Sequence, residues 1–499
     1  MTCGYFAGGV CRAVGALESP LGRDYARLGK VFDAIVIGAG PAGCVAAKLL
    51  ASWGHRILLL GRDSKPANLA ESLPPSAATI VQLTGTQEAV RRAALSHCLG
   101  NVAWWGAGEP RTETYPESSP GTHLLRATLD RELRNSVREL FTQAQVTSVE
   151  RTASGFEVRT STNVFRSPYL LDCSGRAGVA ARRGYRLRNE ALRTIAHAAV
   201  WKAPRPLPLD PAYTMVEAYR DGWAWAIPLS STDIYIGVLV DTQRTERASG
   251  MVRRTMYCAE IEKTVAFRQL VSGSELGEIS SCDASCYAAA RYAEDGLFLA
   301  GDAASAVDPI SSFGVKKALT SAWLAAVCIH TGLADPARKS LASEYYHEQT
   351  RQSHEDLCRH AQQHFSVIAA RQPHPFWAAR AALEPLQLYE PAALLAELRR
   401  LREPSRIALE PTARVRRGVR VKVSGNEVVS EDGWVTDALP PGMEFACGVE
   451  LMKLVDLADK FSQVPDLHQA YNSAAEPVDF PNFLGALCLL LASGVLRHR

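Results

Sequence analysis

Residues 33–63 read DAIVIGAGPAGCVAAKLLASWGHRILLLGRD, which is the order apolar strand, glycine turn, helix and second strand. Directly after the first apolar run, Gly38, Gly40 and Gly43 have the spacing G-x-G-x-x-G. In this spacing the first glycine makes a tight turn, the second lets the backbone approach a pyrophosphate, and the third lets the helix pack close to the strand. Because strands flank it and a helix follows it, the pattern predicts a dinucleotide-binding fold.

The helix after the turn begins at Pro41 and Ala42, and the unpaired N–H groups and dipole at its start favour phosphate groups. The second strand departs from the usual pattern. It runs into Gly61, where an acidic residue that holds the adenosine ribose is expected. We therefore expect either that Asp63 reaches the ribose or that Arg62 stacks on the adenine.

Composition limits the possible classes of protein. The chain has 499 residues and 47% hydrophobic content, enough for a large core and two or three structural units. The formal net charge is only +3, and no basic run interleaves with aromatic residues, so nucleic acid is not an expected partner. The twelve cysteines lack paired C-x-x-C spacing, which is typical of reduced thiols in a cytoplasmic protein and predicts no metal site.

We expect no targeting or membrane signal in the first and last segments of the sequence. Residues 1–30 have no basic residue ahead of their weakly apolar part, so we expect a leader without a secretory signal. The apolar segment 483–495 is too short to span a bilayer, so we expect no contact with a membrane.

Three further segments have clear patterns. Residues 71–75, ESLPP, predict a polar turn, because two prolines do not fit a helix interior or a central strand. Residues 122–137 have leucines at helical spacing and predict an amphipathic helix. Residues 193–241 alternate with period two, which predicts an antiparallel sheet in which Trp223 and Trp225 share one face.

Two more short apolar strands lead into glycine-containing turns. Residues 169–172 lead into DCSGRAG at 172–178, and residues 297–300 lead into GDAASAVDP at 301–309. A strand followed by a glycine turn is the arrangement in which a backbone approaches a cofactor. These turns are therefore expected to lie at the same ligand as the first glycine turn.

GAGPAG, Arg126, DCSGRAG and GDAASAVDP together resemble the FAD-dependent aromatic hydroxylases, and more narrowly their flavin-dependent halogenase branch, over roughly Val31–Ala370. The resemblance implies FAD as cofactor, O2 as co-substrate, and NAD(P)H or a partner flavin reductase as the electron source. It implies that Arg126 contacts the FAD phosphate or ribityl region and that Asp302 binds a ribityl hydroxyl. The residues expected to bind the cofactor are Gly38, Gly40, Pro41, Ala42, Gly43, Arg62, Asp63, Arg126, Asp172, Gly175, Gly301, Asp302, Pro309, Ser312, Gly314 and Val315.

The segment GWAWAIPL at 222–229 is similar to the W-x-W-x-I-P signature of the halogenases; the alternative is a pair of tryptophans on the core face of a strand. Halogenases of this group also need a lysine early in the substrate tunnel, and this chain has none between Lys65 and Lys202. The matching region, 101–111, reads NVAWWGAGEPR. Halogenation is therefore disfavoured. The expected substrate-binding residues are Trp104, Trp105, Trp223 and Trp225.

The remaining chemistry of this family is hydroxylation of an electron-rich ring through a flavin C4a-hydroperoxide. Glu71, His123 and His197 are candidates for the base that removes the ring proton, and the alternative for each is a structural hydrogen bond. The segment SSFGVKKALTSAWLAA resembles flavoproteins that hydroxylate a peptidyl tryptophan during tryptophylquinone biogenesis. We therefore expect a monooxygenase acting on tryptophan in a protein or peptide. A halogenase of an indole or phenol and an FAD-stabilised escort protein are the alternatives.

The expected fold is α/β, with a Rossmann-type FAD-binding domain and an inserted antiparallel-sheet substrate domain. The expected parts are a leader at 1–30, the FAD-binding domain at 31–190 and 291–335, the substrate domain at 191–290, a helical region at 336–410 and a winged-helix-like module at 411–499. In that module we expect turns at 425–426 and 432–433, followed by three short helices. Its basic strand favours an acidic protein partner, and the alternative is a packing lid.

Overall fold

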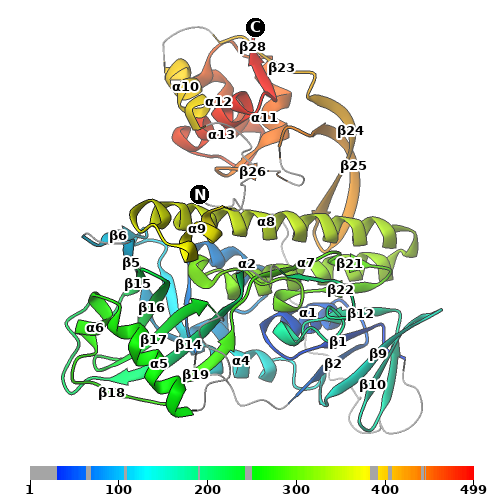
Figure 1. Ribbon diagram of the computed structural model, residues 1–499. Coiled ribbons are helices and arrows are strands. Elements are labelled where there is room, and N and C mark those ends of the chain that lie inside the picture. Colours follow the sequence, from blue (N-terminus) through cyan, green and yellow to red (C-terminus); the bar gives the residue numbers. More distant parts are fainter. Residues whose placement is uncertain are drawn as a thin grey trace. The chain divides into compact units, whose positions relative to one another are not determined.

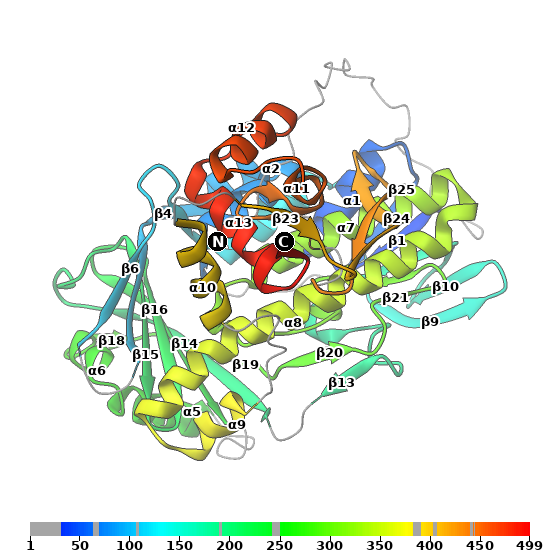
Figure 2. The ribbon, with the colours of Figure 1, turned by 90° about the horizontal axis from the view of Figure 1, so that it is seen from above.

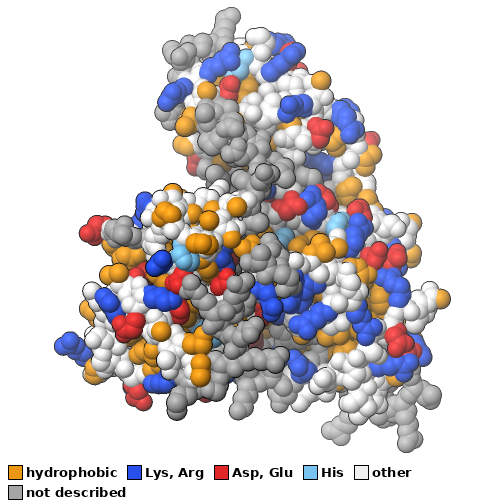
Figure 3. Space-filling model, in the orientation of Figure 1, with side chains coloured by type: hydrophobic (Ala, Val, Ile, Leu, Met, Phe, Trp, Pro, Cys, Tyr) orange, Lys and Arg blue, Asp and Glu red, His pale blue; other side chains and the backbone are white. Residues whose placement is uncertain are grey.

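The computed structural model describes residues 31–62, 69–105, 109–188, 192–241, 250–382, 391–402, 407–439, 443 and 445–499. The predicted leader and Asp63 lie outside the described residues. The chain forms two compact units, one within Gly29–Pro385 and one within Leu386–Arg499. Figure 3 shows side chains of both charge signs interspersed over one face, as the small net charge suggests.

The first unit contains a six-stranded sheet that is parallel except at one edge. Its strands, in spatial order, are β21 (Ala293–Glu294), β22 (Leu297–Leu299), β12 (Tyr169–Asp172), β1 (Ala34–Ile37), β2 (Ile57–Gly61) and β8 (Phe141–Gln143). All residues of β1 are buried, and Ala34 pairs in parallel with both Tyr169 and Ile57. The three glycine turns follow β1, β12 and β22, so all three meet at the carboxyl edge of one sheet.

The helices of this unit are α1 (Pro41–Ser52), α2 (Ala78–Leu83), α3 (Gln87–Ala93), α4 (Arg126–Asn135), α5 (Gly250–Glu262), α6 (Ala266–Leu270), α7 (Gly314–Ala334), α8 (Lys339–Arg371) and α9 (Pro375–Ala381). Both glycine-led helices, α1 and α7, contact each other beside the parallel sheet. The long α8 runs across the unit from β21 to β5, as Figures 1 and 2 show. It therefore ties the parallel sheet to the second large sheet.

The second large sheet has eight strands, which are mostly antiparallel. They are β18 (Glu275–Leu276), β14 (Thr194–Lys202), β17 (Asp233–Asp241), β16 (Gly222–Pro228), β15 (Tyr213–Tyr219), β5 (Gly100–Trp105) and β6 (Arg111–Thr114) in order, with β19 (Ser280–Asp283) paired to β14. The alternation across 193–241 correctly predicted the central strands. The sheet also takes up β5 and β6, which lie outside the predicted substrate domain of 191–290, because β5 pairs in parallel with β15.

One face of this sheet packs against α5 and α6. Met215, Ile236 and Val238 on the strands meet Tyr257 and Phe267 on the helices in one buried cluster. Side chains alternate along a strand, so the neighbouring residues face the other side. On that side Trp223 and Leu239 pack in a buried cluster with Phe365 and Trp377 of α8 and α9. Other residues of the same side line a cavity.

The smaller sheets correct two predictions. They are β3 (Ala70–Leu73), β7 (Gly121–Leu125) and β4 (Ala94–Cys98); β9 (Val146–Thr152), β10 (Gly155–Thr160) and β11 (Val164–Ser167); and the pair β13 (Arg186–Arg188) and β20 (Tyr287–Ala289). Glu71 lies in a strand, not in a polar turn, because both prolines of ESLPP come after β3. The predicted helix at 122–137 begins only at Arg126, because β7 pairs with β3 and β4 up to Leu125.

The second unit has its own core. Its elements are α10 (Pro391–Arg402), β23 (Leu409–Pro411), β24 (Val415–Ser424), β25 (Glu427–Thr436), β26 (Phe445–Ala446), β27 (Val449–Glu450), α11 (Leu451–Ala458), α12 (Val464–Ala474), α13 (Phe480–Ala492) and β28 (Leu496–His498). The hairpin turns at 425–426 as predicted, but residues 432–433 continue β25, pairing with Val419 and Gly418. Because α10 packs on α13, this unit begins before the predicted boundary at 411. The winged-helix likeness stays a prediction.

The basic strand of this unit is largely neutralised within the unit. Arg420 and Lys422 form ion pairs with Glu431 at 2.7 and 2.8 Å, and Arg417 lies over the ring of Trp434. Much of the positive charge that was expected to face an acidic partner is thus paired inside the hairpin. Among the described residues, no helix combines the length and the apolar character needed to cross a membrane.

Candidate active site

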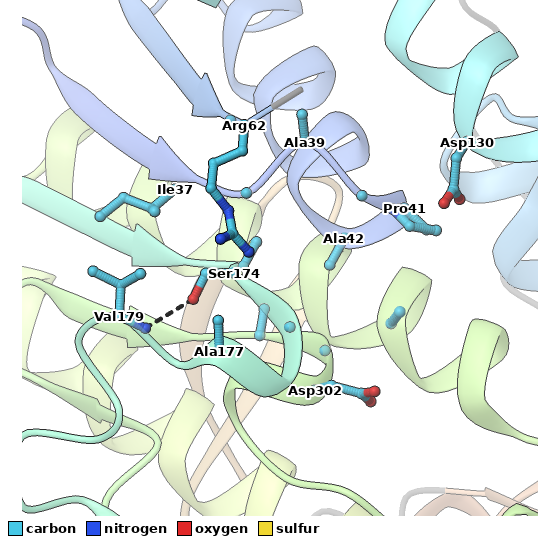
Figure 4. A pocket seen from close by; sticks show the side chains of 18 of the residues that line it. Ile37, Ala39, Pro41, Ala42, Arg62, Asp130, Ser174, Ala177, Val179 and Asp302 are labelled. Atoms are coloured by element: carbon cyan, nitrogen blue, oxygen red, sulfur yellow. Dashed lines mark hydrogen bonds between the residues drawn. The ribbon is translucent and has the colours of Figure 1, made fainter. Parts of the chain in front are cut away.

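A cavity of about 590 Å³ lies at the carboxyl edge of the parallel sheet in the first unit. We call it the glycine cavity. Its lining includes Gly38, Gly40, Pro41, Ala42, Arg62, Glu71, Arg126, Asp130, Ser174, Gly175, Gly301, Asp302, Gly314 and Val315. The volume is within the range of about 300–1,000 Å³ that is usual for cofactor sites. Figure 4 shows Arg62 extending from the end of β2 toward the loop that carries Ser174.

The three glycines of the first turn have different surroundings. Gly38 has φ of +108°, and a Cβ there would lie 2.2 Å from the carbonyl oxygen of Cys173. A Cβ on Gly43 would lie 1.8 Å from the carbonyl oxygen of Gly38, so this glycine allows the close packing predicted for it. A Cβ on Gly40 meets no protein atom within 4 Å. Gly40 therefore keeps open space before the first N–H groups of α1, and the cradle fits a dinucleotide phosphate.

Arg126 stands at the first position of α4, beside two carboxylates. Its Nη1 donates to Glu71 Oε1 at 3.0 Å, and its Nε donates to Asp130 Oδ1 at 3.2 Å. Burial lowers the pKa of Arg126, but the charges of Glu71 and Asp130 outweigh it and raise the pKa above its usual value. A guanidinium at the cavity wall is suited to phosphate or ribityl oxygens.

Asp302 follows β22 in the short turn of Gly301–Ala303. Lys317 Nζ on α7 lies 3.0 Å from its Oδ1, and Arg176 Nε lies 3.9 Å from its Oδ2. Burial raises the pKa of Asp302, yet the charges of Lys317 and Arg176 hold it below its ordinary value. The ionised carboxylate at the cavity wall is an acceptor for a hydroxyl group.

Four predicted cofactor residues lie outside the wall of the glycine cavity: Gly43, Asp172, Pro309 and Ser312. Pro309 and Ser312 line the second cavity described below, which corrects their predicted place. Asp172 is fully buried and accepts hydrogen bonds from the N–H groups of Ser174, Ala180 and Ala181 at 2.9, 2.7 and 3.1 Å. Its carboxylate is therefore occupied in holding the CSGRAG loop, which corrects its predicted contact with the cofactor. Gly43 likewise serves packing.

A second cavity, of about 280 Å³, lies against the face of the antiparallel sheet that is opposite to α5 and α6. We call it the tryptophan cavity. Its lining includes Ala70, Glu71, Ser72, Arg176, Ala196, Ala198, Thr214, Val216, Trp223, Trp225, Ile227, Tyr235, Ser280 to Ala284, Pro309, Ile310 and Ser312. Glu71 lines both cavities, and Arg176 lies between Gly175 and Ala177 of the glycine cavity. The two cavities are therefore neighbours.

The two tryptophans of β16 form part of this wall. Trp223 is 1% exposed, and its ring centroid lies 5.1 Å from that of Trp225. Trp225 lies flat over Gly237, where a Cβ would come within 2.2 Å of the indole ring. Because β16 alternates, both side chains lie on the face that lines the cavity. Trp223 also belongs to the buried cluster with Phe365 and Trp377, so its role in substrate binding stays a prediction.

Trp104 and Trp105 do not line this cavity, which corrects their predicted position. Trp104 pairs with Glu217 and faces α6, where its ring lies 6.5 Å from that of Phe267. Trp105 faces the other side but lies at the strand end, with its ring 5.3 Å from that of His364. Period-two alternation puts adjacent residues of one strand on opposite faces, so both cannot share one wall.

The three candidate bases occupy different places. Glu71 lines both cavities. His123 is fully buried behind Thr214, which does line the tryptophan cavity. His197 lines neither cavity among the described residues, because its neighbours Ala196 and Ala198 face the tryptophan cavity and it faces the opposite side. Its predicted catalytic position is thus corrected, and burial and Arg253 lower its pKa.

Several lining residues were missed by the sequence reading. Asp130, Ser72, Thr214, Tyr235 and Arg176 all line one of the cavities. For Thr214 a signal was present, since it shares strand parity with Val216 and precedes the tryptophan strand. For Ser72 there was none, because its segment was interpreted as a turn.

Known proteins match this architecture and this sequence. The FAD binding domain family matches residues 31–360, well over half of the chain. A tryptophan 2-halogenase of Chondromyces crocatus is 28% identical over 366 residues, which cover 69% of this chain and 70% of that protein. The flavin-dependent halogenase armH4 of Armillaria mellea is 28% identical over 364 residues, covering 62% of this chain and 67% of that protein.

Solved structures extend the likeness to more than nine tenths of the chain. The flavin-dependent halogenase CmlS has a TM-score of 0.76 and 19% identity, covering 94% of this chain and 96% of CmlS. The peptidyl tryptophan dihydroxylase QhpG, which is essential for tryptophylquinone cofactor biogenesis, has a TM-score of 0.66 and 23% identity, covering 93% of this chain and 100% of QhpG. This chain belongs to the FAD binding domain family and is an FAD-dependent enzyme of the halogenase and monooxygenase group.

Proposed function

We propose that this enzyme is a flavin-dependent monooxygenase that hydroxylates an electron-rich aromatic ring, and that the ring is a tryptophan side chain of a protein or peptide. The observation that carries the proposal is the chemistry of the tryptophan cavity. It adjoins the glycine cavity, is walled by aromatic and apolar side chains, and has no lysine among its described lining residues.

The absence of a lining lysine distinguishes the two chemistries of this group. Halogen transfer needs an ammonium group to hold the hypohalous acid near the ring. Lys316 donates to Ser76 Oγ at 3.0 Å, and Lys317 is bound to Asp302, so both nearby lysines are directed elsewhere. Hydroxylation needs no such group.

The residues of this chain have definable tasks. Gly40 and the start of α1 would hold the pyrophosphate, and Arg126 and Asp302 would hold the phosphate or ribityl region. When bound, reduced FAD supplies the activation of O2. Trp223 and Trp225 would orient a flat ring by stacking, and the apolar wall would exclude water.

The size of the tryptophan cavity supports a substrate with one bicyclic ring. Its volume of about 280 Å³ is just below the range of about 300–1,000 Å³ that is usual for small-molecule sites. A single side chain of a larger molecule would fill a cavity of this volume. The likeness to QhpG extends over the whole of that peptidyl tryptophan dihydroxylase, and this supports a polypeptide substrate.

The second candidate function is halogenation of an indole or phenol. The sequence relatives favour it, since a tryptophan 2-halogenase shares 28% identity with this chain. The segment Trp223–Pro228 also keeps the W-x-W-x-I-P pattern. The source of electrons, NAD(P)H or a partner flavin reductase, is part of the proposal for either chemistry.

Mass spectrometry of the product separates the candidates. The reduced holoenzyme is mixed with O2, chloride and bromide, and offered either a tryptophan-containing peptide or free tryptophan. We expect the peptide to gain oxygen and no halogen, and free tryptophan to react slowly. A chlorine or bromine isotope pattern would establish the second candidate, and faster reaction of free tryptophan would remove the polypeptide substrate.

A further inference from the structure

A chain of hydrogen-bonding side chains leads from the tryptophan cavity into the β3–β7–β4 sheet. His123 on β7 is 0% exposed, and both of its ring nitrogens have partners. Nε2 lies 2.9 Å from Thr214 Oγ1, and Nδ1 lies 3.2 Å from Ser96 Oγ. An imidazole with one hydroxyl partner at each nitrogen can accept a proton on one side and donate another on the opposite side.

The two ends of this chain differ in their surroundings. Thr214 is 3% exposed and lines the tryptophan cavity, where a substrate ring would lie. Ser96 is half-buried on β4, between Leu95 and the exposed His97. The path therefore begins at the cavity wall and ends near the protein surface.

A thiol branches from the same chain. Cys98 Sγ accepts a hydrogen bond from Ser72 Oγ at 3.4 Å and lies 3.8 Å from Thr214 Oγ1. Burial raises the pKa of Cys98, but hydrogen bonds from His123 and Ser72 bring it down to about 7. Because this thiol is the titratable neighbour of His123, its contribution is tested separately.

We propose that Thr214, His123 and Ser96 form a proton relay, which carries the proton lost by the substrate ring from the tryptophan cavity to the protein surface. The inference rests on the proposed function for the electrophile, which is oxygen from O2 activated by reduced FAD. It adds the route of the proton and assigns His123 a relay task that does not require it to touch the substrate.

For each proton that enters the relay at Thr214, one proton leaves it at Ser96. When oxygen bonds to a ring carbon, that carbon must lose its hydrogen as a proton for the ring to regain aromaticity. Thr214 Oγ accepts this proton while its own hydroxyl proton passes to His123 Nε2. The proton on His123 Nδ1 then passes to Ser96 Oγ, and Ser96 gives one to solvent. The hydroxyl groups of Thr214 and Ser96 then rotate back, and protons return along the chain in the opposite direction. This restores the original tautomer of His123.

Glu71 is a poorer acceptor for this proton in the resting geometry. Its Oε1 already accepts a hydrogen bond from Arg126 Nη1 at 3.0 Å, and a protonated carboxyl would lose this ion pair. His197 faces the other side of the sheet. Thr214 offers a hydroxyl on the cavity wall whose next partner is the imidazole of His123.

The experiment compares Thr214→Val with Thr214→Ser in the intact holoenzyme. Valine keeps the shape and removes the hydroxyl, whereas serine keeps the hydroxyl. We expect Thr214→Val to slow single-turnover product formation about tenfold or more, with Thr214→Ser within about twofold of the original enzyme. Ser96→Ala should act like Thr214→Val, and Cys98→Ala should leave the rate nearly unchanged.

A proton inventory separates the relay from a structural effect. In mixtures of H2O and D2O, the rate of the original enzyme should depend on the deuterium fraction in a curve, because several protons move together. Thr214→Val should give a straight line. Equal rates in Thr214→Val and Thr214→Ser, or the same curve in both, would overturn the relay.

The relay can still be tested if the proposed hydroxylation is refuted. Halogenation releases a ring proton too, so a halogenated product would refute hydroxylation while the same variants still measure the relay. If no product forms, NMR of histidine-labelled holoenzyme decides: indole added to the cavity should shift the His123 ring nitrogens, and less so in Thr214→Val. Unshifted His123 signals with bound indole would overturn the relay.

Discussion

The glycine cavity and the tryptophan cavity share Glu71 but are built in different ways. The first is formed largely by backbone at three strand ends, where glycines leave space for a ligand to approach. The second is formed by side chains on one face of an eight-stranded sheet, contributed by strands far apart in the sequence. A backbone site tolerates almost no added atoms, whereas a side-chain site can change its shape gradually. The two should therefore respond differently to substitution.

The largest effect is expected from an added Cβ in the first glycine turn. Gly38→Ala forces a residue with φ of +108° to hold a side chain 2.2 Å from a carbonyl oxygen. We expect loss of FAD and a fall in the free energy of unfolding of more than about 2 kcal/mol. Absorbance of bound flavin and urea denaturation measure both.

Gly40→Ala is the matched control for this variant. Its Cβ meets no protein atom within 4 Å, so the folded chain should lose about 1 kcal/mol or less. FAD content should nevertheless fall, because the methyl group enters the space before α1. If the Gly38→Ala protein kept its stability and its full FAD content, the glycine cavity would not be a site formed by backbone.

The second effect concerns the pH dependence of stability, which depends on a buried histidine close to the glycine cavity. His354 on α8 lies near Lys317, and burial with this positive charge lowers its pKa from 6.5 to about 4. Between these values the unfolded chain binds a proton that the folded chain does not, so stability is lost as pH falls from 6.5 to 4. The loss is at most roughly 3 kcal/mol. His354→Asn should flatten this part of the stability profile.

Asp308 supplies a control of opposite sign. Burial raises its pKa from 3.8 to about 6, so the folded chain binds a proton that the unfolded chain does not between these values. Its contribution to stability therefore grows as pH falls, and Asp308→Asn should steepen the acid loss. Urea denaturation at pH 7 and pH 5 compares the variants. An unchanged profile in His354→Asn would contradict the assignment.

The third effect concerns a side chain in the glycine cavity. Asp302→Asn removes the charge that faces Lys317 at 3.0 Å and, with it, the charge-assisted contact to the cofactor that we propose. We expect the Kd for FAD to rise about 10- to 100-fold, which corresponds to roughly 1.5–3 kcal/mol. Asp295→Asn, at a carboxylate whose side chain is 80% exposed, is the control and should leave the Kd unchanged. Equal flavin affinity in both variants would remove Asp302 from the site.

The same contrast explains how much the sequence could predict. Gly38, Arg126 and Asp302 were all placed at one site, because a backbone cradle requires fixed residue types at fixed spacing. Tyr235 was missed and Trp104 was assigned to the wrong wall, because a sheet face depends on which strands pair. Thr214 was missed although strand parity gave a signal for it. His123 was predicted in a helix, yet its pairing with Ser72 and Ser96 puts it in a strand. Local periodicity does not contain such long-range pairings.

The smallest effect is expected in the wall of the tryptophan cavity. Trp225→Phe keeps an aromatic face but reduces its area, so substrate affinity should fall by about 0.5–1.5 kcal/mol, roughly two- to twelvefold. FAD content should stay the same, because Trp225 does not line the glycine cavity. Gly237→Ala tests the same wall from behind, since its Cβ would come within 2.2 Å of the Trp225 ring and push that ring into the cavity. Titration with a tryptophan-containing peptide should show a larger loss for Gly237→Ala than for Trp225→Phe. If neither variant changed peptide affinity, the two tryptophans would be core residues, and only the glycine cavity would remain as a defined binding site.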